Sequence, residues 1–213
     1  MDIRFSTREF KDLAIAWVAL GVAFTAFYFN AEIRALLGGV RTDAAIEVLT
    51  VGFAISMATA GVGFLLHELA HKVVAVHYGQ AAEFRADYNM LFLAVMAGLA
   101  GFLFAAPGAV YHRGFVTKRE QGLIALAGPV TNVALVAVFG ALWLAGGATA
   151  DLLATVGWLG VIINALLAGF NMIPFGPLDG KKVMNWSRPV WVATAGPMIV
   201  GAVWLLFGGG ISL

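Results

Sequence analysis

GVGFLLHELAHKVVAV, residues 61–76, places three ionisable side chains inside a mostly apolar segment of helical character. His67 and His71 are four residues apart, so they share one face of a helix. This H-E-x-x-H spacing lets both imidazoles reach one zinc ion, with Glu68 beside a water molecule as general base. Ionisable groups at membrane depth are costly and usually functional. The segment therefore predicts a zinc site within a membrane helix, and a polar patch that joins helices is the alternative.

The composition of the whole chain supports a membrane environment for this segment. Of the 213 residues, 61% are hydrophobic and only 12% are charged, whereas soluble domains carry about 25% charged residues. The net charge of +1 gives no indication of nucleic acid binding. The chain has no cysteine, which excludes a thiolate zinc site and a cysteine nucleophile. Lipid is thus the expected solvent, and the expected zinc ligands are imidazole and carboxylate.

Hydrophobic segments outside 61–76 predict a polytopic, all-α membrane protein. A spanning helix needs about 20 mostly apolar residues. We expect one domain over residues 1–213, with a catalytic core at about 46–186 and flanking helices at 13–29 and 190–207. No cleaved signal peptide is expected at the N-terminus. The six apolar segments are 13–29, 48–76, 91–106, 122–145, 152–173 and 190–207.

A third zinc ligand has to come from outside the H-E-x-x-H motif, because a catalytic zinc ion takes three protein ligands and keeps one open position. His77 and His112 lie in or near polar loops, where we expect them to be solvated. Asp179 follows two prolines and precedes Gly180, so it is expected on irregular backbone at a helix end. Such backbone at membrane depth lines an enclosed or watery cavity. Taken alone, Asp179 is better explained by an ordinary Asp-Gly turn at the membrane interface.

Three motifs in one order resemble the site-2 protease family of intramembrane zinc metalloproteases. They are His67-Glu68-Leu69-Ala70-His71, then the Ala-Gly-Pro signature within residues 125–132, then Asn171-x-x-Pro174 with Leu178-Asp179-Gly180. The resemblance covers about residues 61–180. It implies one zinc ion held by His67, His71 and Asp179, with Glu68 as the catalytic base. It also implies that Asn171 borders the site and contacts the substrate or the oxyanion, and Asn132 is a second candidate for that contact.

The segment between the two metal-binding motifs is expected to enter the membrane and return. His67 and Asp179 can meet at one metal only if their helices run in the same direction, and one full crossing by residues 91–111 would reverse one of them. Gly98, Gly101, Pro107 and Gly108 supply places to bend. Residues 108–111 predict a short strand, extending at most to 115, whose edge could pair with an unwound substrate. A plain loop is the alternative for those residues.

The distribution of positive charge favours the same topology. With the N-terminus inside and residues 91–111 re-entrant, only Arg34 and Arg41 of the 13 lysines and arginines lie outside, which leaves 11 inside. A six-crossing version with the N-terminus outside places only eight inside. The zinc site is then expected toward the cytoplasmic side of a prokaryotic plasma membrane.

Two other classes of function compete with a protease that cuts transmembrane protein substrates. One is a catalytically silent relative, although Glu68 would then have no purpose. The other is a membrane metal-binding or transport protein, which calls for polar residues along a pathway. Here the polar residues cluster at one depth, and Asn132 and Asn164 are expected mainly to form hydrogen bonds between helices. A homo-oligomer stays an alternative to a monomer.

Overall fold

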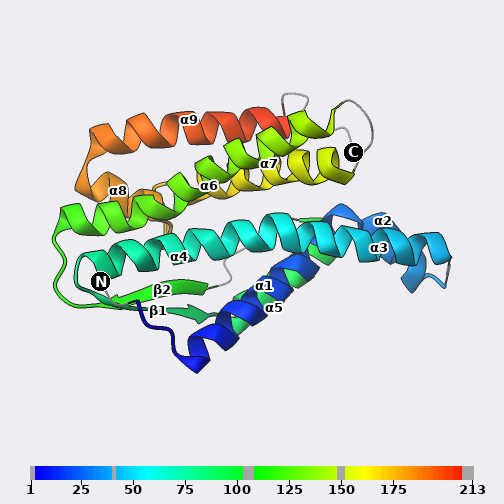
Figure 1. Ribbon diagram of the computed structural model, residues 1–213, viewed down its shortest axis with the longest axis horizontal. Coiled ribbons are helices and arrows are strands. Elements are labelled where there is room, and N and C mark those ends of the chain that lie inside the picture. Colours follow the sequence, from blue (N-terminus) through cyan, green and yellow to red (C-terminus); the bar gives the residue numbers. More distant parts are fainter. Residues whose placement is uncertain (1–2, 40–41, 103–107, 148–151, 208–213) are drawn as a thin grey trace. The chain divides into compact units, whose positions relative to one another are not determined.

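The computed structural model describes residues 3–39, 42–102, 108–147 and 152–207 of the chain (Figure 1). Helices dominate these residues, and two short strands form one small sheet. The elements in chain order are α1 (Thr7–Tyr28), α2 (Asn30–Leu37), α3 (Asp43–Ser56), the π-helix η1 (Met57–Gly61), α4 (Val62–His77), β1 (Ala81–Ala86), α5 (Tyr88–Leu99), β2 (Gly108–Arg113), α6 (Lys118–Gly146), α7 (Leu152–Asn171), α8 (Asp179–Trp186) and α9 (Arg188–Phe207).

Five helices of the described residues are long and apolar enough to cross a membrane. This confirms the expected all-α membrane protein and five of the six predicted segments. The second spanning helix is the continuous run of α3, η1 and α4, and it holds the H-E-x-x-H motif near its C-terminal end. The five spans are Thr7–Tyr28, Asp43–His77, Lys118–Gly146, Leu152–Asn171 and Arg188–Phe207.

The sixth apolar segment forms only a short helix. Helix α5 has 12 residues, which span about 18 Å at 1.5 Å per residue, well short of a hydrocarbon core of about 30 Å. Gly108, the first residue of β2, lies directly against the Arg85 carbonyl at the end of β1. The chain therefore comes back to the place that it left, as a re-entrant segment does. Pro107, one of the expected bends, lies outside the described residues.

The strand predicted at 108–111 is present and continues to Arg113. Its partner β1 was not predicted from the sequence. Gly108 lies beside Arg85 and Gly114 lies beside Gln80, so the two strands are antiparallel. Pairing explains why the strand forms here, since a lone extended segment would leave its backbone groups without partners.

The chain divides into two compact units, which we describe separately. Unit 1 contains residues 1–4, 63–83 and 110–213, and unit 2 contains residues 5–62 and 84–109. Both strands of the sheet pass from one unit into the other.

In unit 2, helix α1 packs closely on α5 and covers the outer edge of β1. The Glu9 and Asp12 carboxylates are buried and accept hydrogen bonds from the backbone amides of Phe84 (3.0 Å) and Ala86 (3.4 Å). Amides two residues apart point to the same edge of a strand. Carboxylates of α1 therefore take the place that a further strand would occupy along β1, which blocks this edge from pairing.

In unit 1, helices α6 and α7 are antiparallel neighbours that approach closely at small residues. A Cβ at Gly157 would meet the Trp143 backbone, and Gly146 lies against Ala154. Small residues are what permits such approach between membrane helices.

Helix α4 runs parallel to α7 in the same unit. Gly63 lies against Asn164 of α7, while His71, two turns further along α4, meets Asp179 beyond the end of α7. Residues nearer the C-terminal end of α4 thus contact residues nearer the C-terminal end of α7 or beyond it. The common direction of the two helices, which the sequence argument requires, is present in the structure.

Candidate metal centre

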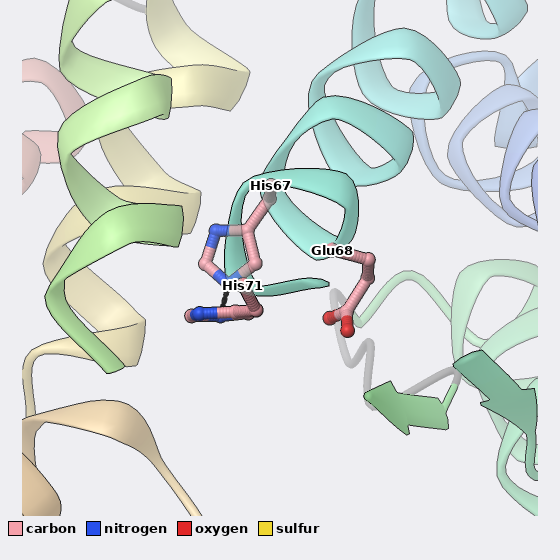
Figure 2. A group of neighbouring side chains, drawn as sticks. All are labelled: His67, Glu68 and His71. Atoms are coloured by element: carbon pink, nitrogen blue, oxygen red, sulfur yellow. Dashed lines mark hydrogen bonds between the residues drawn. The ribbon is translucent and has the colours of Figure 1, made fainter. Parts of the chain in front are cut away.

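His67, Glu68 and His71 lie within the last three turns of α4 and are all buried. The Nε2 atoms of the two imidazoles are 3.0 Å apart. Figure 2 shows both imidazoles on one side of α4, with Glu68 pointing to another side, toward the strands. The ligand atoms of the three side chains lie within 4.8 Å of one another, and they form a group able to hold a metal ion.

Asp179 joins this group from a different helix. Its Oδ2 lies 3.4 Å from His67 Nε2 and 3.0 Å from His71 Nε2. The sequence placed Asp179 on irregular backbone, whereas in the structure it is the first residue of α8, after the turns of residues 172–178. Gly180 lies so close to the Met172 carbonyl that a Cβ would collide with it. The Asp-Gly pair is therefore required by packing as well as by chemistry.

The three converging atoms fit a zinc ion. Zinc takes nitrogen and oxygen ligands at about 2.0–2.2 Å in a tetrahedral arrangement, and neighbouring ligands of such a tetrahedron are about 3.3–3.5 Å apart by simple geometry. The distances of 3.0, 3.4 and 3.0 Å among His67, His71 and Asp179 are close to this value. Two imidazoles and one carboxylate are also a ligand set that leaves a fourth position open.

The charges around Asp179 keep it ionised, as a ligand must be. Burial alone would raise its pKa, but the His71 and His67 imidazoles and the Lys182 ammonium hold the pKa of the Asp179 carboxyl well below its usual range. Lys182 Nζ donates to Asp179 Oδ1 at 3.1 Å. The second oxygen, Oδ2, is thereby left to face the imidazoles.

Hydrogen bonds to the far ring nitrogens orient both histidines. His71 Nδ1 lies 2.7 Å from the Ile124 carbonyl, and His67 Nδ1 lies 2.6 Å from Asn132 Oδ1. Both partners are oxygens that only accept, so each Nδ1 carries a hydrogen and each Nε2 is the nitrogen left to face a metal ion. Such outer contacts fix ring orientation in metal sites. Asn132 forms hydrogen bonds between helices, as expected.

Gly128 explains the Ala-Gly-Pro signature in physical terms. A Cβ at this position would lie 2.5 Å from the Nε2 atoms of both His67 and His71. Only glycine lets α6 approach α4 so closely that the imidazoles pack against its backbone. The signature therefore shapes one wall of the metal centre.

We expect Gly128→Ala to weaken zinc binding by at least about tenfold, because the added methyl group would push both imidazoles away from their positions. Zinc affinity can be measured by competition with a chelator. The matched control is Gly140→Ala, since a Cβ at Gly140 on the same helix meets only Val161 at an ordinary distance of 3.8 Å. Equal zinc affinity in the two variants would contradict this explanation of Gly128.

Glu68 is placed differently from the three ligand atoms. The backbone amide of Val110 on β2 is hydrogen bonded to its carboxylate. Its other oxygen, Oε2, is buried and has no hydrogen-bond partner among the described residues. A buried carboxylate oxygen without a partner is costly unless a ligand or water uses it. This oxygen is suited to accept a proton from a water molecule at the metal centre.

The remaining sequence candidates make other contacts. Asn171 ends α7 and its side chain donates to the Leu167 carbonyl at 2.9 Å, so its contact with substrate stays a prediction. His77 is exposed beside Tyr78, as expected. His112 was expected in a polar loop but is half-buried on β2. Burial, then the charges of Lys182 and His71, lower the pKa of His112.

Two features of the site were missed at the level of sequence. Lys182 is three residues after Asp179, a spacing that brings side chains together only if a helix begins at Asp179. His112 is two residues after Val110, so the two share a strand face if residues 108–113 are extended. Either signal becomes visible only once the local structure is known.

Comparison with known proteins agrees with this chemistry. The chain is similar to a protein of Methanocaldococcus jannaschii named "Putative zinc metalloprotease MJ0611", with 41% identity over 96% of this chain and 97% of that protein. It is also similar to proteins with the corresponding names Rip3 from Mycobacterium tuberculosis, at 33% identity over 68% of this chain and 40% of the relative, and YwhC from Bacillus subtilis, at 31% over 58% and 64%. No family model and no solved structure matches the chain.

Proposed function

This chain belongs to the zinc metalloprotease family of these relatives, and we propose that it is a site-2 protease-like endopeptidase that hydrolyses transmembrane protein substrates within the bilayer. One observation carries this proposal. Three ligand atoms of His67, His71 and Asp179 converge beside Glu68. His67 and His71 lie on a helix long and apolar enough to span a membrane, and Asp179 follows the end of another such helix, α7. A soluble protease would not need its site on such helices.

The residues have distinct roles in the proposed reaction. Zinc, when bound by His67, His71 and Asp179, supplies the Lewis acidity that activates water and polarises the scissile carbonyl. Glu68 accepts the proton of the attacking water at its carboxylate and later donates it to the amine that leaves, so protons balance over one turnover. Asn171 is the proposed contact for the oxyanion or substrate. The amide of Asn132 is already bonded to protein groups, so we assign it to the positioning of His67.

The edge of β2 is the proposed binding site for the unwound substrate. The Val110 amide reaches Glu68, so the backbone groups of this edge lie on the side of the catalytic base. An extended peptide that pairs with His112, whose backbone groups point to the same edge as those of Val110, would run toward Glu68 by strand addition. On the other strand, the edge of β1 is blocked by Glu9 and Asp12. The free edge of β2 is therefore the favoured binding site for the substrate strand.

Metal removal tests the function directly. We expect the purified chain in proteoliposomes to cleave a transmembrane helical peptide, to lose cleavage on chelation, and to regain it with about one zinc ion per chain. Full zinc binding without cleavage would instead support a catalytically silent protein. Zinc flux across the vesicle membrane would support transport.

The proposed topology places the metal centre toward the cytoplasmic side. The chain has no cysteine, so single cysteines can be labelled from either side of a cell or vesicle. We expect cysteines at Ala81, Lys118 and Lys181 to react with a membrane-impermeant reagent from the inside, and a cysteine at Arg34 to react from the outside. If Ala81 and Lys118 react from opposite sides, residues 88–108 cross the membrane and the re-entrant topology is wrong.

A further inference from the structure

A chain of buried amide groups connects the metal centre to α7. Asn132 of α6 and Asn164 of α7 both have 0% of their surface exposed, inside helices that are apolar enough to cross a membrane. Buried amides are costly unless they are hydrogen bonded. Asn164 lies against Gly63 of α4, and its side chain is hydrogen bonded to Asn132 and to the Gly160 carbonyl, neither of which is a metal ligand.

In this series of amides, which runs from Gly160 through Asn164 and Asn132 to His67, each hydrogen bond fixes the direction of the next. Asn164 Nδ2 donates to the Gly160 carbonyl at 2.9 Å, which turns its Oδ1 away from that carbonyl. Asn132 Nδ2 donates to this Oδ1 at 2.9 Å and to the Gly63 carbonyl at 3.2 Å. The oxygen of Asn132 is thereby left to face His67 Nδ1, 2.6 Å away.

An amide oxygen cannot donate, so His67 Nδ1 must carry a hydrogen, and in the neutral imidazole Nε2 is then the nitrogen whose lone pair can bind a metal. Reversal of either amide would bring two donors or two acceptors together at each hydrogen bond that this amide forms. Gly63 adds a steric constraint, since a Cβ there would lie 2.5 Å from Asn164 Oδ1. The two helices hold the Asn164 amide closely in this orientation.

The two histidines differ in how their tautomers are set. His71 is oriented directly by the backbone carbonyl of Ile124, which cannot rotate. His67 relies on a side-chain amide, which is free to turn over unless something holds it. This difference gives Asn164 a function that a hydrogen bonder between helices would not have.

We propose that Asn164 is a positioning residue for the metal centre, which sets the tautomer of His67 through Asn132. The inference rests on the zinc site of the proposed function and not on cleavage. Without Asn164, only the longer hydrogen bond to the Gly63 carbonyl, at 3.2 Å, still holds the Asn132 amide. The amide can then turn its nitrogen to His67 more easily, which favours hydrogen on Nε2 and removes the lone pair. Loss of such an outer contact typically costs 10- to 100-fold in metal affinity.

Two substitutions at this position separate the hydrogen bond from the packing. Asn164→Leu keeps the approximate shape of the side chain and removes its oxygen. Asn164→Asp keeps an oxygen toward Asn132, and in its neutral form its hydroxyl can donate to Gly160 as the amide does. Thr59→Val is the matched control, because it removes another fully buried hydrogen bond, from Thr59 Oγ1 to the Ile55 carbonyl, in a spanning helix.

The experiment measures zinc affinity by chelator competition, and the His67 tautomer by ¹⁵N NMR of the zinc-free protein. We expect Asn164→Leu to weaken zinc binding about 10- to 100-fold and to shift His67 toward the Nε2–H form, with His71 unchanged. Asn164→Asp and Thr59→Val should stay within about threefold of wild type on the same scale. In an Asn132→Ala background, Asn164→Leu should add little, because both act through one contact.

Wild-type affinity and an unchanged His67 tautomer in Asn164→Leu would overturn the proposal. So would an equal loss in Asn164→Asp, or full additivity with Asn132→Ala, because either would indicate packing. None of these readouts depends on proteolysis. A protein that binds zinc through this chain of amides but cleaves no substrate would leave this inference standing and remove the proposed function.

Discussion

Glu68→Gln is expected to abolish proteolysis while zinc stays bound. The amide has nearly the shape of the carboxylate but cannot accept the proton of the attacking water, and general-base catalysis contributes about 10²- to 10⁴-fold. Zinc is expected to remain because the atoms of His67, His71 and Asp179 converge without Glu68. The Val110 amide still finds an oxygen on the glutamine, so the local structure is expected to persist.

Single-turnover cleavage of a transmembrane peptide, together with zinc content, checks this expectation. Glu32→Gln is the matched control, because it makes the same chemical change on α2, far along the chain from the motif. Near wild-type cleavage by Glu68→Gln would remove Glu68 from the mechanism. Loss of zinc along with activity would instead make Glu68 part of the ligand set.

The features that the sequence predicted well depend on local pattern. Spanning helices follow from the length of apolar segments, and the pairing of His67 with His71 follows from helical periodicity. The re-entrant segment needed a second step, since it came from the requirement that the helices ending near His71 and before Asp179 run in parallel. That requirement combines chemistry with connectivity, and the short α5 satisfies it.

The features that the sequence did not predict depend on contacts distant in the chain. The strand Ala81–Ala86 lacks the β-branched residues that mark a strand, and it exists because β2 pairs with it. The Ile124 carbonyl that orients His71 is a backbone group. Every residue has such a group, so the residue type at position 124 cannot predict this contact. The same holds for Gly128, whose role is visible only as the space that its missing Cβ leaves to two imidazoles.

Asp179→Ala is expected to cause the second large loss, of both zinc and proteolysis. Removal of Asp179 leaves two imidazoles as ligands, and it also leaves Lys182 without the carboxylate that it contacts at 3.1 Å. We expect zinc affinity to fall by more than the 10- to 100-fold that an outer contact is worth, as measured by chelator competition. Cleavage should fall with zinc occupancy.

Two companion variants separate a lost ligand from a disturbed helix α8. Lys182→Met keeps Asp179 and removes only the ammonium group beside it, and the Lys182 side chain is 43% exposed. This variant should therefore lower zinc affinity less than Asp179→Ala does. Asn171→Ala should keep zinc and lower turnover if Asn171 contacts the substrate or the oxyanion. If zinc and turnover both survive Asp179→Ala, the third ligand lies elsewhere. His112 would then be the next candidate, because it is the half-buried histidine of β2, the strand whose Val110 amide reaches Glu68.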